Sequence, residues 1–165
     1  MFTRALFTTV MVAFLAVGCS SKKPKNDQDA GAGANGANNG LTLELNGSSD
    51  SSTAGGLQTV YFDFDSSSLD GSTKETVKAN AEFLKTNASV DVQVEGHCDE
   101  RGGRQYNLAL GERRAKAVRD YLVALGVEAK RVSIVSYGNE RPNAEGHDES
   151  AWSKNRRGNF VVTAK

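Results

Sequence analysis

The sequence predicts an α/β fold, a two-layer sandwich in which one β-sheet carries helices on a single face. Three observations lead to this prediction. Four short segments alternate apolar and polar residues, which is typical of strands with one buried side. Two longer segments between them repeat apolar residues at helical spacing. Strand-like and helix-like segments also take turns along the chain, and this order favours crossover connections that bring the strands into one sheet.

The first half of the domain is predicted to be strand, helix, strand. Residues 60–64 alternate, which places Phe64 on the buried side of the first strand. The sequence Ser72-Thr73-Lys74-Glu75 fits a capping box, so a helix is expected to begin there. Residues 90–94 alternate again and form the second strand, with their valines on the buried side.

The second half is predicted to be helix, strand, helical turn, strand. A long helix covers about 105–125 and ends at Gly126, a residue type that favours helix ends. The third strand is expected at 132–137, a helical turn at 150–155, and the fourth strand at 160–163.

Composition divides the chain into three segments. Residues 1–18 combine a short basic start with an apolar stretch, which is typical of an export signal and too short to span a bilayer. Cys19 follows "LAVG" and resembles the lipidated cysteine of the bacterial lipobox, the alternative being a plain secretory signal. Residues 19–56 are rich in Gly, Ala, Asn and Ser and are predicted to be a flexible linker. Within it, 41–45 alternates apolar and polar residues and is expected to be weakly ordered, the alternative being a short strand that docks on the domain or on a partner. Residues 57–165 hold the domain.

Charge and cysteine content exclude several classes of function. The chain carries 20 basic and 20 acidic residues, so it lacks the positive field that nucleic-acid binders use. If Cys19 is lipidated, Cys98 is the one remaining thiol, because the chain has two cysteines. An internal disulfide and a CxxC metal or redox site are then both excluded.

His97, Cys98, Asp99 and Glu100 stand in a row, which raises the question of a catalytic or metal site. Neighbouring residues of a strand point to opposite sides, so His97 cannot come within the roughly 3 Å that a Cys–His pair requires. A zinc site needs three well-placed ligands, and the second histidine lies in a distant loop. We therefore expect no enzyme, no metal and no cofactor, with a Cys98-dependent hydrolase as the disfavoured alternative.

Arg114 is the unexpected residue of the long helix. It lies on the same face as Asn107 and Leu110, at the border of the buried stripe. An arginine in this position needs a carboxylate, and Asp99 just before the helix is the expected neighbour. Either the two residues pair with each other, or they bind a ligand that carries an amine and a carboxylate together.

Four segments resemble the OmpA-like family of cell-wall-binding domains. They are "VYFDFDSSSL", "VEGHCDERGGRQYNLALGERRAKAVRDYL", "SYGNERP" and "WSKNRRGNFVV", and the resemblance covers 57–165 behind a lipoprotein signal. It implies the element order β-α-β-α-β-β with a mixed sheet. It also implies non-covalent binding of peptidoglycan through the diaminopimelate side chain of the stem peptide.

Matching the family's motif to this sequence gives the expected binding residues. Asp99 and Arg114 would take the zwitterionic end of diaminopimelate, with Arg114 as a bidentate clamp on its carboxylate. Asn107 and Leu110 would line the groove, and Arg101 is a further candidate. The end of the first strand would form the opposite wall through Phe64, Asp65 and Ser66.

The resemblance also implies a place in the cell. The chain would be an outer-membrane lipoprotein that faces the periplasm and tethers the outer membrane to the cell wall as a component of the Tol system. This would support envelope integrity and outer-membrane invagination during division. The arginines after Asn155 are expected to be solvated, although the resemblance adds the periplasmic β-propeller protein of the Tol system as a partner there. The alternative is a protein–protein adaptor of the envelope that does not touch murein.

Overall fold

The structure is a computed structural model that describes residues 42–165. The expected signal segment at 1–18, Cys19 and the linker up to residue 41 lie outside the described residues. Within the described region of the chain, every helix is too short or too polar to span a bilayer.

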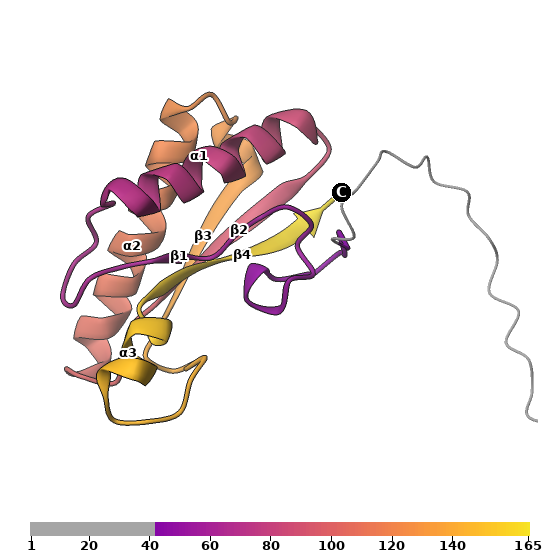
Figure 1. Cartoon of the computed structure of the whole chain (residues 1–165). Coiled ribbons are helices and arrows are strands. Elements are labelled where there is room, and N and C mark those ends of the chain that lie inside the picture. The colour runs from indigo at the N-terminus through magenta and orange to yellow at the C-terminus, as the bar shows by residue number, and fades with distance from the viewer. Residues whose placement is uncertain (1–41) are drawn as a thin grey trace, which may run out of the picture. The chain divides into compact units, whose positions relative to one another are not determined.

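The described region is built on one mixed four-stranded sheet (Figure 1). Its strands are β1 (Val60–Tyr61), β2 (Asp91–His97), β3 (Val132–Gly138) and β4 (Arg157–Ala164). Their order across the sheet is β1-β4-β2-β3. β2 and β3 run parallel, whereas β4 runs antiparallel to both β1 and β2. The predicted α/β fold with a mixed sheet is confirmed.

Two long helices, α1 (Gly71–Thr86) and α2 (Arg104–Ala124), form the second layer (Figure 1). Their apolar residues share one core with those of the sheet. From the helices come Val77, Ala81, Leu84, Ala115, Val118 and Leu122, and from the strands Val92, Val94, Phe160 and Val162. A short helix, α3 (Glu149–Asn155), lies at the end of the sheet where β4 begins.

Gly96 and Gly111 let α2 lie directly on β2. A Cβ atom added to Gly96 would stand 1.8 Å from the carbonyl oxygen of Gly111. A Cβ atom on Gly111 would stand 2.4 Å from Ser136 Oγ and 2.7 Å from the carbonyl oxygen of Gly96. Only glycine therefore fits at either position. This close approach brings the first half of α2 against the carboxyl end of β2.

The start of the domain differs from the prediction in two details. β1 ends at Tyr61, and a turn follows in which Asp65 has a φ of 52°. Phe64 therefore leaves the sheet and is 58% exposed, so its predicted burial is wrong. Helix α1 begins before the predicted capping box, because the Asp70 carboxylate accepts a hydrogen bond from Thr73 N at 2.6 Å and caps the helix.

The other elements agree with the sequence within a few residues. α2 ends just before Gly126, which has a φ of +98°. β3, α3 and β4 all lie where they were predicted, although β4 begins three residues earlier than the apolar alternation indicated.

Residues 42–56, which we call the N-terminal strap, pack on the domain, so the linker prediction is wrong for this segment. Within the strap, Glu44 N donates to Thr53 O at 3.0 Å and Gly55 N donates to Thr42 O at 2.8 Å. The strap also pairs with β4, because Asn46 N donates to Val162 O and Val162 N donates to Gly47 O. The physical reason is the two-residue length of β1, which leaves the rest of the β4 edge without a partner.

Candidate functional site

A cavity of about 150 Å³ opens where the carboxyl end of β2 meets the first turns of α2 and the β1–α1 loop. It combines apolar walls with charged groups, as ligand sites commonly do. The lining residues are Phe64, Asp65, Cys98, Asp99, Arg101, Gly102, Tyr106, Asn107, Leu110 and Arg114. All of the predicted binding residues except Ser66 are among them. Ser66 contributes through its backbone, as described next.

Arg114 is fully buried and is held by backbone carbonyl groups. Its Nε donates to Ser66 O at 2.7 Å, its Nη1 to His97 O at 2.8 Å and its Nη2 to Asp63 O at 3.0 Å. The expectation that this arginine needs a carboxylate of the protein is therefore wrong, since three carbonyl oxygens satisfy it. Burial lowers the pKa of the guanidinium from its usual value. A guanidinium has five N–H groups, so one remains on each Nη.

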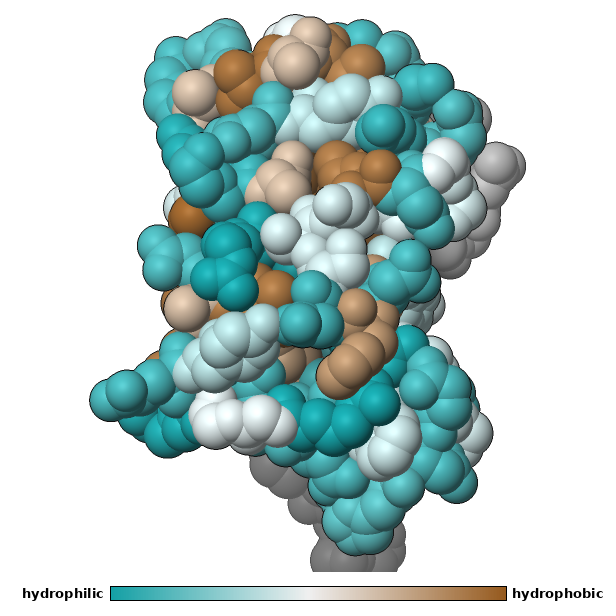
Figure 2. Space-filling view, turned by 90° about the vertical axis from the view of Figure 1, so that its left-hand side faces the viewer, coloured by the Kyte–Doolittle hydropathy of each residue, from teal (hydrophilic) through white to brown (hydrophobic). Residues whose placement is uncertain are grey.

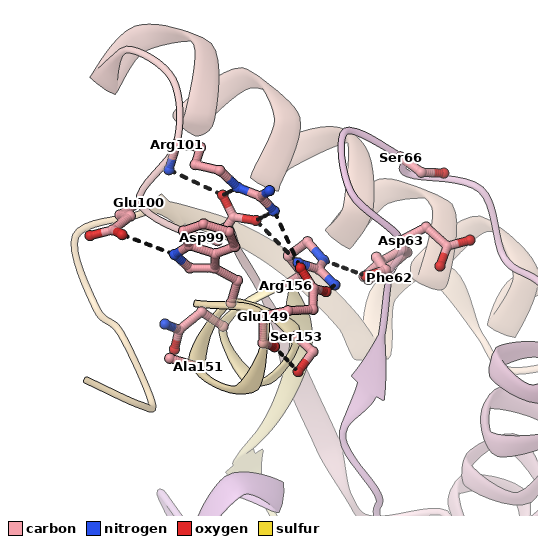
Figure 3. Close-up of polar contacts among 12 residues, drawn as sticks. Phe62, Asp63, Ser66, Asp99, Glu100, Arg101, Glu149, Ala151, Ser153 and Arg156 are labelled. Carbon is pink, nitrogen blue, oxygen red and sulfur yellow. Dashed lines mark hydrogen bonds and ion pairs between the residues drawn. The ribbon is translucent and has the colours of Figure 1, made fainter. Parts of the chain in front are cut away.

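Asp99 is buried and pairs with two other arginines (Figure 3). Its Oδ1 accepts from Arg101 N at 3.1 Å and Nε at 3.2 Å. Its Oδ2 accepts from Arg101 Nη2 at 2.6 Å and from Arg156 Nη1 at 3.3 Å. Burial works against the ionised carboxylate, but these hydrogen bonds outweigh it and hold the pKa of Asp99 below its ordinary value. Asp99 and Arg114 thus line one cavity without neutralising each other.

Arg156 is a site residue that the sequence reasoning missed. It is buried, and its Nε donates to Phe62 O at 3.0 Å while its Nη2 pairs with Glu149. The prediction of solvated arginines after Asn155 is wrong for both Arg156 and Arg157, because both are buried. One signal could have found this. Extending the alternation of Phe160 and Val162 backwards places Arg156 on the helix side of the sheet and Arg157 on the other side.

Aromatic rings form the outer rim of the cavity. The Arg101 guanidinium carbon lies 3.9 Å from the centre of the Phe64 ring and 4.0 Å from that of Trp152. The Tyr106 hydroxyl donates to Asp65, and both residues line the cavity. The space-filling view of the side formed by α2 shows small apolar patches separated by polar atoms (Figure 2). A broad apolar docking face of the kind that large protein interfaces use is not seen on this side.

Cys98 and His97 point to opposite sides of the sheet, as predicted. Cys98 Sγ donates to Asn107 O at 3.3 Å on the helix side, and burial raises the pKa of the thiol. His97 stacks on Tyr137 with ring centres 5.6 Å apart and lies beside Glu95. A protonated thiol without a base in reach is a poor nucleophile. Residues 42–165 also bring no three potential metal ligands together.

Comparison with known proteins gives concordant matches. The model of the OmpA family matches residues 61–156. The peptidoglycan-associated lipoprotein of Pseudomonas aeruginosa is 46% identical over 153 residues, which cover 87% of each chain. That of Brucella melitensis is 43% identical over 160 residues, covering 96% of this chain and 89% of the relative.

Solved structures agree with these relatives. The crystal structure of the peptidoglycan-associated lipoprotein from Burkholderia pseudomallei has 44% identity and a TM-score of 0.61, and the match covers 63% of this chain and 88% of that one. The C-terminal domain of Helicobacter pylori MotB reaches a TM-score of 0.62 at 21% identity, covering 67% of this chain and 87% of that one, and shows likeness of fold alone.

Proposed function

Because this chain belongs to the OmpA family and, within it, to the peptidoglycan-associated lipoproteins of the cell envelope, we propose that its cavity binds peptidoglycan non-covalently. The family consists of structural proteins and not of enzymes. The proposed ligand is the zwitterionic end of diaminopimelate in the stem peptide of the wall.

The observation that carries this proposal is the arrangement of opposite charges in one cavity. Arg114 and Asp99 both line it, and neither is neutralised by the other. The two N–H groups that remain on Arg114 are the number that a carboxylate takes in a bidentate contact. The Asp99 carboxylate is the acceptor for the amine.

The two arginines around Asp99 differ in exposure. Arg156 is buried and also bonded to Phe62 O, so it stays in place. Arg101 has 31% of its side chain exposed and has a second carboxylate, Glu149, at 3.9 Å. An incoming ammonium group would reach Asp99 beside Arg101, while both arginines keep the carboxylate oriented.

The expected affinity of such a site is modest. Each charge-assisted hydrogen bond contributes about 1.5 to 3 kcal/mol, and some of this offsets the loss of bound water. Weak, reversible binding is sufficient when many copies of a protein bind the same polymer. Murein offers such a repeating ligand, so that many weak contacts add up.

The proposed cellular role rests on the N-terminal sequence. Cys19 would carry acyl chains that hold the chain in the outer membrane, with the domain facing the periplasm. The residues between Cys19 and the strap would form the tether. In this role the protein links the outer membrane to the wall within the Tol system, with the periplasmic β-propeller protein as a second partner. It would support envelope integrity and the invagination of the outer membrane during division.

Co-sedimentation with purified sacculi tests the binding site. The protein is residues 19–165 carrying Cys19→Ser, so that no lipid interferes. We expect Asp99→Ala and Arg114→Ala each to reduce sedimentation at least tenfold, the loss for one charge-assisted contact. Lys116→Ala and Asp120→Ala are the matched controls, because this ion pair lies exposed on the same helix.

Two further measurements make the result decisive. Thermal unfolding shows whether the Arg114→Ala protein is folded, and Arg114→Lys keeps the charge without the bidentate geometry. Free fragments that contain diaminopimelate should compete with the sacculi. Undiminished sedimentation of both site variants would remove the proposal, and binding that follows the Tol partner but ignores murein would favour an adaptor.

A further inference from the structure

The Arg101 side chain is fixed between two aromatic rings that come from distant segments of the chain. Phe64 belongs to the loop after β1, and Trp152 belongs to α3. The guanidinium carbon lies about equally far from both ring centres, at 3.9 and 4.0 Å. Such stacks hold a planar guanidinium in one orientation. Arg101 therefore presents its Nε and Nη2 donors to Asp99 in a defined direction.

The indole of Trp152 is itself held in place. Its Nε1 donates to Glu100 Oε1 at 2.9 Å. The Glu100 carboxylate also contacts His147 Nδ1, at 2.8 Å from Oε2, which ties the loop before α3 to the same carboxylate. A bonded indole keeps its ring plane over Arg101 with less freedom than an unbonded one.

Neither Trp152 nor Glu100 lines the cavity. Both act on it through Arg101, which lines the cavity and gives three hydrogen bonds to Asp99. Long side chains such as arginine lose conformational freedom when a ligand orders them. A stack that orders Arg101 beforehand removes this cost from the binding step.

We propose that Trp152 and Glu100 are positioning residues of the peptidoglycan site, which hold Arg101 against Phe64 and keep Asp99 oriented for its ligand. This inference rests on the proposed function, because it names residues that prepare the same cavity. It adds α3 to the elements of the fold that determine affinity, although α3 contributes no lining residue.

The test measures binding of a soluble muropeptide that carries diaminopimelate to residues 19–165 with Cys19→Ser, by isothermal titration. Trp152→Ala should weaken binding about tenfold, in line with the loss of a partly desolvated cation–π contact. Trp152→Phe keeps a ring over Arg101 and should stay within about threefold of the parent. Glu100→Ala should weaken binding about threefold, and Glu100→Gln, which keeps an acceptor for the indole, should bind like the parent.

A spectroscopic reading separates positioning from a structural role. Trp152 is the one tryptophan of the chain, so its emission reports on the stack directly. We expect the emission to change when the muropeptide saturates the parent protein. Tyr61→Ala is the control for the affinity measurements. Tyr61 is also an exposed aromatic residue but lies outside this cavity, so the Tyr61→Ala protein should bind the muropeptide as the parent does.

Each outcome decides between distinct conclusions. If the parent binds muropeptide and Trp152→Ala binds equally well, the positioning role is overturned and the proposed function stands. If the parent itself does not bind, the proposed function fails and this inference fails with it. Should Trp152→Ala not fold, the comparison of Glu100→Ala with Glu100→Gln decides, and equal affinities of these two overturn the inference.

Discussion

Arg156 and Arg157 are neighbours in sequence, yet they form two different kinds of charged cluster on opposite sides of the sheet. Arg156 meets Asp99 on the helix side, beside the cavity. Arg157 meets Asp50 on the other side, with its Nε 2.6 Å from Asp50 Oδ2. Both arginines are buried, and both have a carboxylate and backbone carbonyls as partners.

The second cluster is closed by the N-terminal strap. Asn159 Oδ1 accepts from the hydroxyl groups of Ser48 and Ser49, and Asn159 Nδ2 donates to Glu95. The Asp50 carboxylate accepts from Thr59 as well as from Arg157. These hydrogen bonds join the polar groups of the cluster to one another, so few of these groups remain to bind a ligand.

The difference teaches that a buried ion pair does not by itself indicate a binding site. Such pairs occur on both sides of this sheet. A cavity adjoins each pair, since one of about 380 Å³ is lined by Ser49, Asp50 and Thr59 beside the second cluster. What sets the helix side apart is Arg114, which lines the cavity there and has N–H groups beyond its three carbonyl bonds. On the other side, Arg157 is bonded to Asp50 and does not line the adjoining cavity.

The largest expected effect comes from replacing one arginine at a time with methionine. Arg156→Met and Arg157→Met should each lower the free energy of unfolding by about 3 kcal/mol, because Asp50 loses its arginine partner and the buried Asp99 loses one of its two. Only Arg156→Met should also abolish sedimentation of the folded protein with sacculi. Urea unfolding and sedimentation at low temperature measure the two quantities. A folded Arg157→Met protein that does not bind would break the comparison.

A comparable loss of stability, without a loss of binding, is expected from removing the strap. A chain that begins at residue 57 should be less stable than one that begins at residue 42 by about 3 kcal/mol, because it loses the Asp50 partner of Arg157 together with the hydrogen bonds to β4. Murein binding of the folded protein should be unchanged, because no strap residue lines the cavity. Urea unfolding and sedimentation of both chains provide the test. Equal stabilities would mean that the strap contacts contribute nothing.

The smallest expected effect is a pH dependence from His97 in the closed cluster. Neither ring nitrogen makes a hydrogen bond within residues 42–165, and burial lowers the pKa of His97 despite Glu95 nearby. Arg157 also lowers this pKa, whereas Asp50 raises it. The unfolded chain binds the proton near pH 6.5 and the folded chain does not, so stability should fall as the pH drops below that value.

The variant His97→Phe, which keeps the ring stacked on Tyr137, should reduce this loss between about pH 7 and pH 5. Urea unfolding at several pH values gives the measurement. His147→Gln is the control, because Glu100 raises the pKa of His147, so protonation of this exposed residue acts in the opposite direction. An unchanged pH profile in His97→Phe would assign the acid sensitivity to other groups.

The sequence was most informative where one element determines the geometry. Asn107, Leu110 and Arg114 share one face of α2, so the helical period alone brings them to a common wall. Its position just before the helix indicated Asp99, and the family motif then added the residues after β1. These predictions need no knowledge of how distant elements pack.

Prediction failed where a polar group finds its partner through tertiary structure. Arg114 was expected to need a carboxylate, whereas carbonyl groups from two separate segments of the chain satisfy it. The strap was read as linker because it contains few apolar residues, but backbone pairing with β4 holds it, and composition does not report such pairing. Phe64 continued an alternation that the turn at Asp65 interrupts.

The hairpin inside the strap gives the chain a mechanical property. A load applied on the N-terminal side of residue 42 pulls first on the bond between Thr42 and Gly55, then on that between Glu44 and Thr53. These bonds break in succession, as in a zipper, before the load reaches β4. Once the bonds of Asn46 and Gly47 to Val162 have also broken, the strap, residues 42–56, spans at most roughly 50 Å. A sudden force would thus extend the strap before it deforms the cavity, so the cavity keeps its shape and its bound ligand.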